Sequence, residues 1–167
     1  MTFGSDDANL LLNPRVCGTL LFMAFSAAAS PASSWTVHPV GDSVTLMESG
    51  DDYHVEIGCQ RPSGSKLRFE VHRFFPPVEE LTKIRSVQVM LEQGQEATFS
   101  ETIDVTLSDE RDVKVVGEVN FSPDDIETLV KASRMTISDN ATGKILFRSQ
   151  MQGILGGRDL LRERCGI

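Results

Sequence analysis

The sequence predicts a mainly β protein, specifically an antiparallel β-sandwich of about seven to eight strands with one short internal helix and a short C-terminal helix. Apolar and polar residues alternate through most of the chain after residue 32, as they do in half-buried strands. Turn residues separate these segments every 8–15 residues or so, which suits the short strands of a sandwich. A partly open barrel would give the same pattern.

Residues 1–32 have the layout of a secretory signal peptide. Arg15 precedes an uncharged and mostly apolar run, and small residues follow at 27–29 and 30–32, where a signal peptidase could cut. The alternative is an uncleaved anchor, but the uncharged segment 16–32 is rich in Ala, Ser and Gly, and a membrane span needs about 20 apolar residues. We therefore expect a mature domain over 33–167, without stable membrane insertion, in the periplasm or secreted.

The first hairpin is predicted at residues 53–59 and 66–74, on either side of the turn residues Arg61–Ser65. Trp35 lies ahead of it and is expected to pack a first strand onto the core. The core-facing positions of the hairpin are Tyr53, Val55, Ile57, Cys59, Leu67, Phe69 and Val71. The intervening residues are polar, so the hairpin should be half-buried.

The remaining elements follow from the same signals. Two consecutive prolines end the hairpin pattern, residues 78–84 favour a turn of helix, and alternation returns at 87–91, 103–107 and 113–121. Ser122 and Pro123 predict a helix start, supported by two acidic residues at 124 and 125, and this helix should end near Ser133. A second hairpin surrounds residues 139–143, and residues 158–165 favour a short helix.

Two cysteines remain after removal of residues 1–32, namely Cys59 and Cys165. In an oxidising compartment such a pair is normally a disulfide, and this one would close nearly the whole domain. No CxxC or CxH spacing favours a metal pair or a reactive thiol. The sequence therefore predicts a structural disulfide.

Charge and motif content exclude several functions. The formal net charge of −8 and the pI near 4.8 argue against binding to nucleic acid, which requires a basic face. The sequence has no GxSxG, HExxH, P-loop or GxGxxG motif, and no cofactor is implied. We therefore expect a protein that is not an enzyme.

The outer face of the first hairpin holds the clearest group of candidate ligands. If the turn pairs positions whose numbers sum to 126, His54 lies opposite His72 and Glu56 opposite Glu70. Opposed residues on one face have Cβ atoms about 4.5–5.5 Å apart, so two imidazoles and two carboxylates would be placed to bind Zn²⁺ or Cu²⁺. The alternative is an ordinary polar face on which Lys66, Arg68 and Arg73 neutralise the glutamates.

The C-terminal half resembles a known family of exported proteins. Its residues run Asn120-Phe121-Ser122-Pro123-Asp124-Asp125, then Met135-Thr136-Ile137-Ser138-Asp139, Gly143-Lys144 and Met151-Gln152-Gly153-Ile154-Leu155. This order of strand, acidic helix start, hairpin and glycine-rich tail resembles the invasion-associated locus B family of small exported Gram-negative proteins, and the tail also resembles accessory envelope proteins of type VI secretion. The resemblance implies a non-catalytic role linked to host-cell entry or to the envelope.

These observations favour a non-enzymatic envelope or secreted protein that binds a protein partner. Phe74 and Phe75, beside two prolines, are the best candidates for an apolar contact patch. The alternatives are a metal-dependent or enzymatic periplasmic factor that uses the His54/His72 face, and an acidic inhibitor of a basic target protein.

Overall fold

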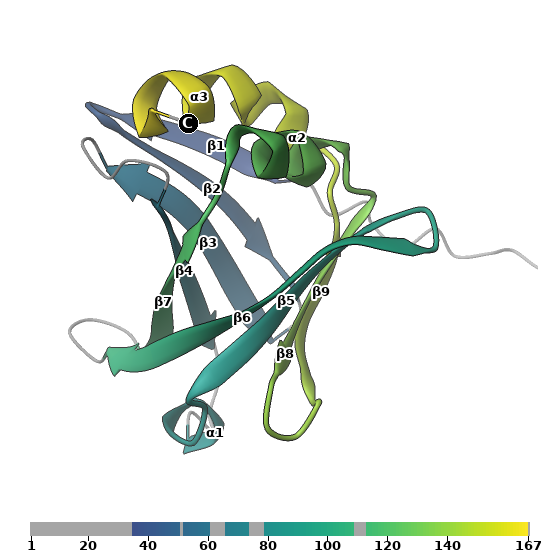
Figure 1. Ribbon diagram of the computed structural model, residues 1–167. Helices are drawn as coiled ribbons and strands as arrows, with labels where there is room; N and C mark the ends of the chain where they lie inside the picture. The colour runs from purple at the N-terminus through teal and green to yellow at the C-terminus, as the bar shows by residue number, and fades with distance from the viewer. Residues whose placement is uncertain (1–34, 51, 61–65, 74–78, 109–112, 167) are drawn as a thin grey trace, which may run out of the picture. The chain divides into compact units, whose positions relative to one another are not determined.

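The computed structural model describes residues 35–50, 52–60, 66–73, 79–108 and 113–166, which belong to one unit of the chain (Figure 1). Within these residues, nine strands form one antiparallel sheet in the order β1-β2-β3-β4-β7-β6-β5-β8-β9. The strands are β1 (Thr36–Val40), β2 (Ser43–Ser49), β3 (Tyr53–Gln60), β4 (Lys66–Arg73), β5 (Ser86–Gln93), β6 (Glu96–Ser108), β7 (Lys114–Asn120), β8 (Arg134–Asp139) and β9 (Ile145–Gln150).

The long strand β6 belongs to both halves of this sheet. Its residues 96–104 pair with β5, and its residues 105–108 pair with β7. Gly117 of β7 lies opposite Val105 at this crossing, and a Cβ there would approach Ile103 Cγ2 to 2.6 Å and the Asp104 carbonyl oxygen to 2.9 Å. Only glycine fits where β6 passes from one half to the other, because any larger residue would clash with the strand beside it.

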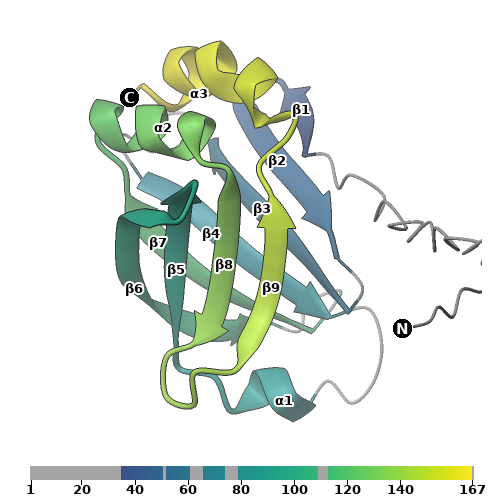
Figure 2. The same ribbon diagram turned by 90° about the vertical axis from the view of Figure 1, so that its right-hand side faces the viewer.

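The two halves face each other across the apolar core (Figure 2). Phe121, which follows β7, contacts Phe69 of β4 at 6.4 Å and Phe99 of β6 at 5.1 Å between ring centroids. Trp35 meets Phe147 of β9 edge to face, and its backbone N–H donates to the Gln152 carbonyl at 2.8 Å. This bond joins the chain before β1 to the chain after β9, although the sheet itself is not closed.

Short helices lie at the two ends of the sheet. Helices α2 (Pro123–Lys131) and α3 (Arg158–Cys165), with the 3₁₀ helix η1 (Ile154–Gly157), lie at one end, and α1 (Glu79–Thr82) lies at the other, as both ribbon views show. Helix α2 begins as expected, because Ser122 and Asp125 form a reciprocal capping box and Pro123 occupies the first turn. Its buried face consists of Ile126, Leu129 and Val130.

The predicted mainly β, antiparallel fold is confirmed, as are the helical turn near residue 80 and the C-terminal helix. The expected count of seven to eight strands is too low, and the two facing halves are one continuous sheet instead of two separate ones. Only a first strand near Trp35 is expected ahead of the hairpin, whereas the structure has β1 and β2 there. Strand β1 has almost no buried residue and therefore shows no alternation, but β2 does alternate and is missing from the prediction. Within the part of the chain that the structure describes, no helix is long and apolar enough to cross a bilayer.

Candidate functional site

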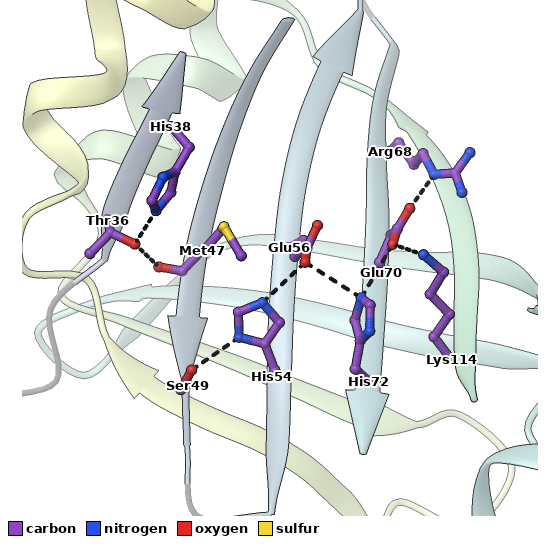
Figure 3. Close-up of polar contacts among 10 residues, drawn as sticks. All are labelled: Thr36, His38, Met47, Ser49, His54, Glu56, Arg68, Glu70, His72 and Lys114. Carbon is purple, nitrogen blue, oxygen red and sulfur yellow. Dashed lines mark hydrogen bonds and ion pairs between the residues drawn. The ribbon is translucent and has the colours of Figure 1, made fainter. Parts of the chain in front are cut away.

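The outer face of β2, β3, β4 and β7 carries a band of polar side chains (Figure 3). The strand register arranges this band in three rows, which are Ser49, His54, His72 and Lys114; Met47, Glu56 and Glu70; and Thr45, Gly58, Arg68 and Glu118. His54 therefore pairs with His72, and Glu56 with Glu70, in the register that the hairpin sequence predicts. The opposite face of β3 and β4 packs into the core, so this band alone faces outward on these strands.

Both histidines lie near the Glu56 carboxylate, and His72 Nε2 also forms a 3.2 Å hydrogen bond with Glu70 Oε2. His54 Nε2 lies 3.2 Å and His72 Nε2 lies 3.7 Å from Glu56 Oε1. The imidazole rings are arranged edge to face, with centroids 5.5 Å apart. Ser49 Oγ forms a 3.0 Å hydrogen bond with His54 Nδ1 and fixes the orientation of that ring. Because both histidine side chains are nearly nine-tenths buried, at 12% and 13% exposure, their rings have little freedom to turn.

Burial disfavours the charged imidazolium and lowers the pKa of His72, although the nearby Glu56 carboxylate opposes this effect. This shift favours the neutral ring, which is the form that offers a nitrogen lone pair.

Glu70 is already held by two cations. Lys114 Nζ donates to Glu70 Oε2 at 2.5 Å, and Arg68 Nε donates to Glu70 Oε1 at 2.5 Å. Burial by itself would raise the pKa of Glu70, but the hydrogen bonds from Lys114 and Arg68 outweigh it and hold this pKa below its usual value. Glu70 is thus a buried, ionised carboxylate whose charge is balanced by Lys114 and Arg68.

The proposed neutralisation by Lys66, Arg68 and Arg73 is correct only for Arg68. Lys66 Nζ lies 3.4 Å from Glu118, and Arg73 Nη1 lies 2.6 Å from Glu80. The second cation at Glu70 is Lys114, which a neighbouring strand supplies from 44 positions away in sequence. Among the described residues, the hydrogen bonds and ion pairs of Glu56 are with the two histidines alone.

A hollow of about 260 Å³ adjoins the row of glutamates. Its lining includes Thr45, Glu56, Gly58, Arg68 and Glu70. A Cβ at Gly58 would lie 2.8 Å from the Val44 carbonyl oxygen, so β2 excludes any side chain there. The glycine therefore leaves a recess in an outer face that side chains would otherwise fill.

The predicted disulfide is present between Cys59, in β3, and Cys165, at the end of α3. Their Cα atoms are 5.6 Å apart, and both residues are buried. Leu161 and Cys165 form the buried face of α3, as their spacing predicts. The bond fixes α3 to the sheet and leaves no free thiol in the described part of the chain. The candidate contact residues Phe74 and Phe75 lie outside the described residues.

Sequence reasoning missed a second ionic cluster, centred on Glu80 in α1. Arg73 Nη1 and Lys144 Nζ both donate to Glu80 Oε2 at 2.6 Å, and the Tyr53 hydroxyl lies 3.4 Å from the same atom. The hydrogen bond from Lys144 is the main cause of the lowered pKa of Glu80. The cluster ties α1 to β4 and to the turn before β9. Nearby sequence could not predict this cluster, because Glu80 and Lys144 are 64 positions apart.

Sequence reasoning also missed Glu48, a buried carboxylate on the inner face of β2. Ser149 Oγ lies 3.4 Å from Glu48 Oε1, and the two residues are 101 positions apart. A signal for it exists, because Glu48 continues the core-facing series of Val44 and Leu46 at every second position. A charged residue at such a position indicates a polar partner inside the fold.

Comparison of the chain with protein-family models, with curated proteins and with solved structures finds no match in any of the three.

Proposed function

We propose that this is an exported, non-enzymatic binding protein that recognises a protein partner through the outer face of β2, β3 and β4. The observation that carries this proposal is the recess over Gly58, a hollow of about 260 Å³ with charged and hydroxyl groups around it. A concave surface with polar groups in fixed positions suits recognition, since shape and charge complementarity together fix a partner's orientation.

The charges around the recess are held in place and are of both signs. Arg68, whose side chain is 55% exposed, is oriented by its bond to Glu70, and Glu118 follows in the same row on β7. A preorganised charge loses less side-chain freedom on binding than a mobile one. Arg68 is therefore the residue we expect to contribute most to a partner contact on this face.

Export is supported by the leader-like residues 1–32 and by the disulfide, because such bonds persist in oxidising compartments. Expression of the full chain in a Gram-negative host, followed by intact-mass analysis of the periplasmic fraction, tests this part. The expected mass is that of a chain that begins near residue 33 and lacks two hydrogens for the disulfide. Full-length protein in the cytoplasm, with free thiols, would contradict export.

Binding is tested by capture from envelope extracts, followed by rebinding of the purified partner. Arg68→Glu should abolish rebinding, whereas Lys131→Glu, the same charge reversal on the exposed side of α2, should leave it unchanged. Equal unfolding midpoints of the two variants would show that folding is not the cause. If both variants rebind as wild type does, the proposed face is wrong. Capture of a basic enzyme that the protein inactivates would instead favour the inhibitor hypothesis.

A further inference from the structure

The histidine and glutamate rows are spaced like the ligands of a metal ion. A tetrahedral Zn²⁺ site with bonds of 2.0–2.1 Å places its ligand atoms about 3.3 Å from one another. His54 Nε2 and His72 Nε2 lie 3.2 and 3.7 Å from Glu56 Oε1. Each imidazole nitrogen is thus close to the separation from Glu56 that one ion would require.

The orientation of the ligands supports the same site. The bond between Ser49 Oγ and His54 Nδ1 leaves Nε2 of that ring directed at Glu56, and metal-binding histidines commonly use their second nitrogen in this way. The edge-to-face arrangement of the imidazoles, with centroids 5.5 Å apart, lets both Nε2 atoms face the same carboxylate (Figure 3). Their burial restricts both rings, so little side-chain freedom would be lost on binding.

The charges distinguish the two glutamates. Glu70 contacts His72 Nε2 at 3.2 Å and has Lys114 and Arg68 as cationic partners, each at 2.5 Å. In the described part of the chain, the hydrogen bonds and ion pairs of Glu56 are with imidazoles alone. Glu56, Glu70 and His72 have ligand atoms within 4.8 Å of one another, which places Glu70 next to the proposed ligands, but Lys114 and Arg68 already balance its charge. A divalent cation would therefore gain most from Glu56, the carboxylate that lacks a cation.

We propose that His54, Glu56 and His72 bind one divalent transition-metal ion, Zn²⁺ or Cu²⁺, with a fourth position open to water or to a partner's side chain. Two imidazoles and one carboxylate suit these ions, and a site with three protein ligands keeps a position free. Glu56 also lines the recess, so the ion would lie at its margin. The inference rests on the proposed function, since it names the ligand of the same outer face.

Binding is tested with the disulfide-intact mature protein, purified without a histidine tag, by calorimetric titration with ZnCl₂ and with CuCl₂. Wild type should bind one ion per chain. The double variant His54→Ala/His72→Ala should lose binding, and Glu56→Gln should weaken it at least tenfold. His38→Ala is the matched control, because His38 is the remaining histidine and its Nε2 contacts Thr36 Oγ1 on β1. This variant should bind as wild type does.

Several outcomes would overturn the proposal. Wild type that takes up no ion, a double variant that still binds one ion, or loss of binding in His38→Ala would each do so. A larger loss in Glu70→Gln than in Glu56→Gln would overturn the ligand assignment. Electron paramagnetic resonance of the Cu²⁺ form of wild type should show coupling to two imidazole nitrogens, and this test does not depend on the folding of any variant.

The metal proposal and the partner proposal fail separately. Partner capture repeated with EDTA shows whether the ion is needed for the contact. Capture that persists in EDTA, together with no metal uptake in the titration, would refute the metal site and leave the binding function standing. One bound ion with no partner captured under either condition would support the metal site and refute the partner contact.

Discussion

Removal of the disulfide between Cys59 and Cys165 should cost this protein much of its stability. The two residues are 106 positions apart, so the bond closes a long loop in the unfolded chain. The chain-entropy relation gives about 16 cal/mol/K for a loop of that length, or about 4.8 kcal/mol at 25 °C. The net stability of small domains is about 5–15 kcal/mol, so the reduced protein should be close to the limit of folding.

The assay is urea unfolding of the oxidised protein, of the protein reduced with a phosphine, and of Cys59→Ala/Cys165→Ala. With an m value of about 1.5–2 kcal/mol/M, the reduced protein should unfold about 2.5–3 M earlier. The double variant should be less stable than the reduced protein, because both side chains are buried and their sulfur atoms fill core space. Since the unlinked unfolded chain is more expanded, m should rise on reduction.

The change in the m value on reduction can refute the loop-entropy reasoning. If reduction merely released α3 from β3, the native state would bury less surface, so m would fall while the midpoint changed little. A loss below about 2 kcal/mol together with a reduced m would show that the bond acts on the native docking of α3 and that the loop-entropy reasoning is wrong.

Three further outcomes follow from local structure. In urea unfolding, Gly117→Ala should destabilise the protein by about 1–3 kcal/mol, because its Cβ would overlap Ile103. The control is Gly156→Ala, whose new Cβ has nothing within 4 Å and which should change stability by less than about 0.5 kcal/mol. Ser122→Ala should cost about 1 kcal/mol in the same assay through loss of the α2 cap, and no change would mean that the cap contributes nothing. The lowered pKa of Glu70 adds stability that is complete above its unfolded pKa of 4.5 and is lost as the pH falls through the lower folded value, so thermal midpoints of Glu70→Gln between pH 6 and pH 2 should fall less steeply than those of wild type.

The hairpin of β3 and β4 shows what nearby residues are sufficient to predict. Its register follows from alternation and a short turn, so His54 and His72 are paired correctly without knowledge of any other strand. Helix α2 is likewise local, because Ser122, Pro123 and Asp125 satisfy its first turn from within the same segment. The disulfide follows from the cysteine count together with the expected removal of residues 1–32, which would leave a single possible pairing.

Which strands lie beside these elements cannot be read from the nearby sequence. Alternation reveals which side of a strand is buried but not which strand lies beside it, because backbone hydrogen bonds are alike between any two strands. The placement of β7 beside β4 brings Lys114 to Glu70, and thereby separates a neutralised glutamate from Glu56.

The sequence alone thus determined the buried faces of the predicted strands, the register of the first hairpin and the start of α2, since each depends on residues close together in the chain. The disulfide pair followed from a count of cysteines, given the expected removal of residues 1–32. The tertiary structure decided the strand order, the passage of β6 through both halves of the sheet, the recess over Gly58 and the cation partners of each carboxylate. These features depend on contacts between segments that are far apart in sequence, and such contacts are set by the packing of the whole domain.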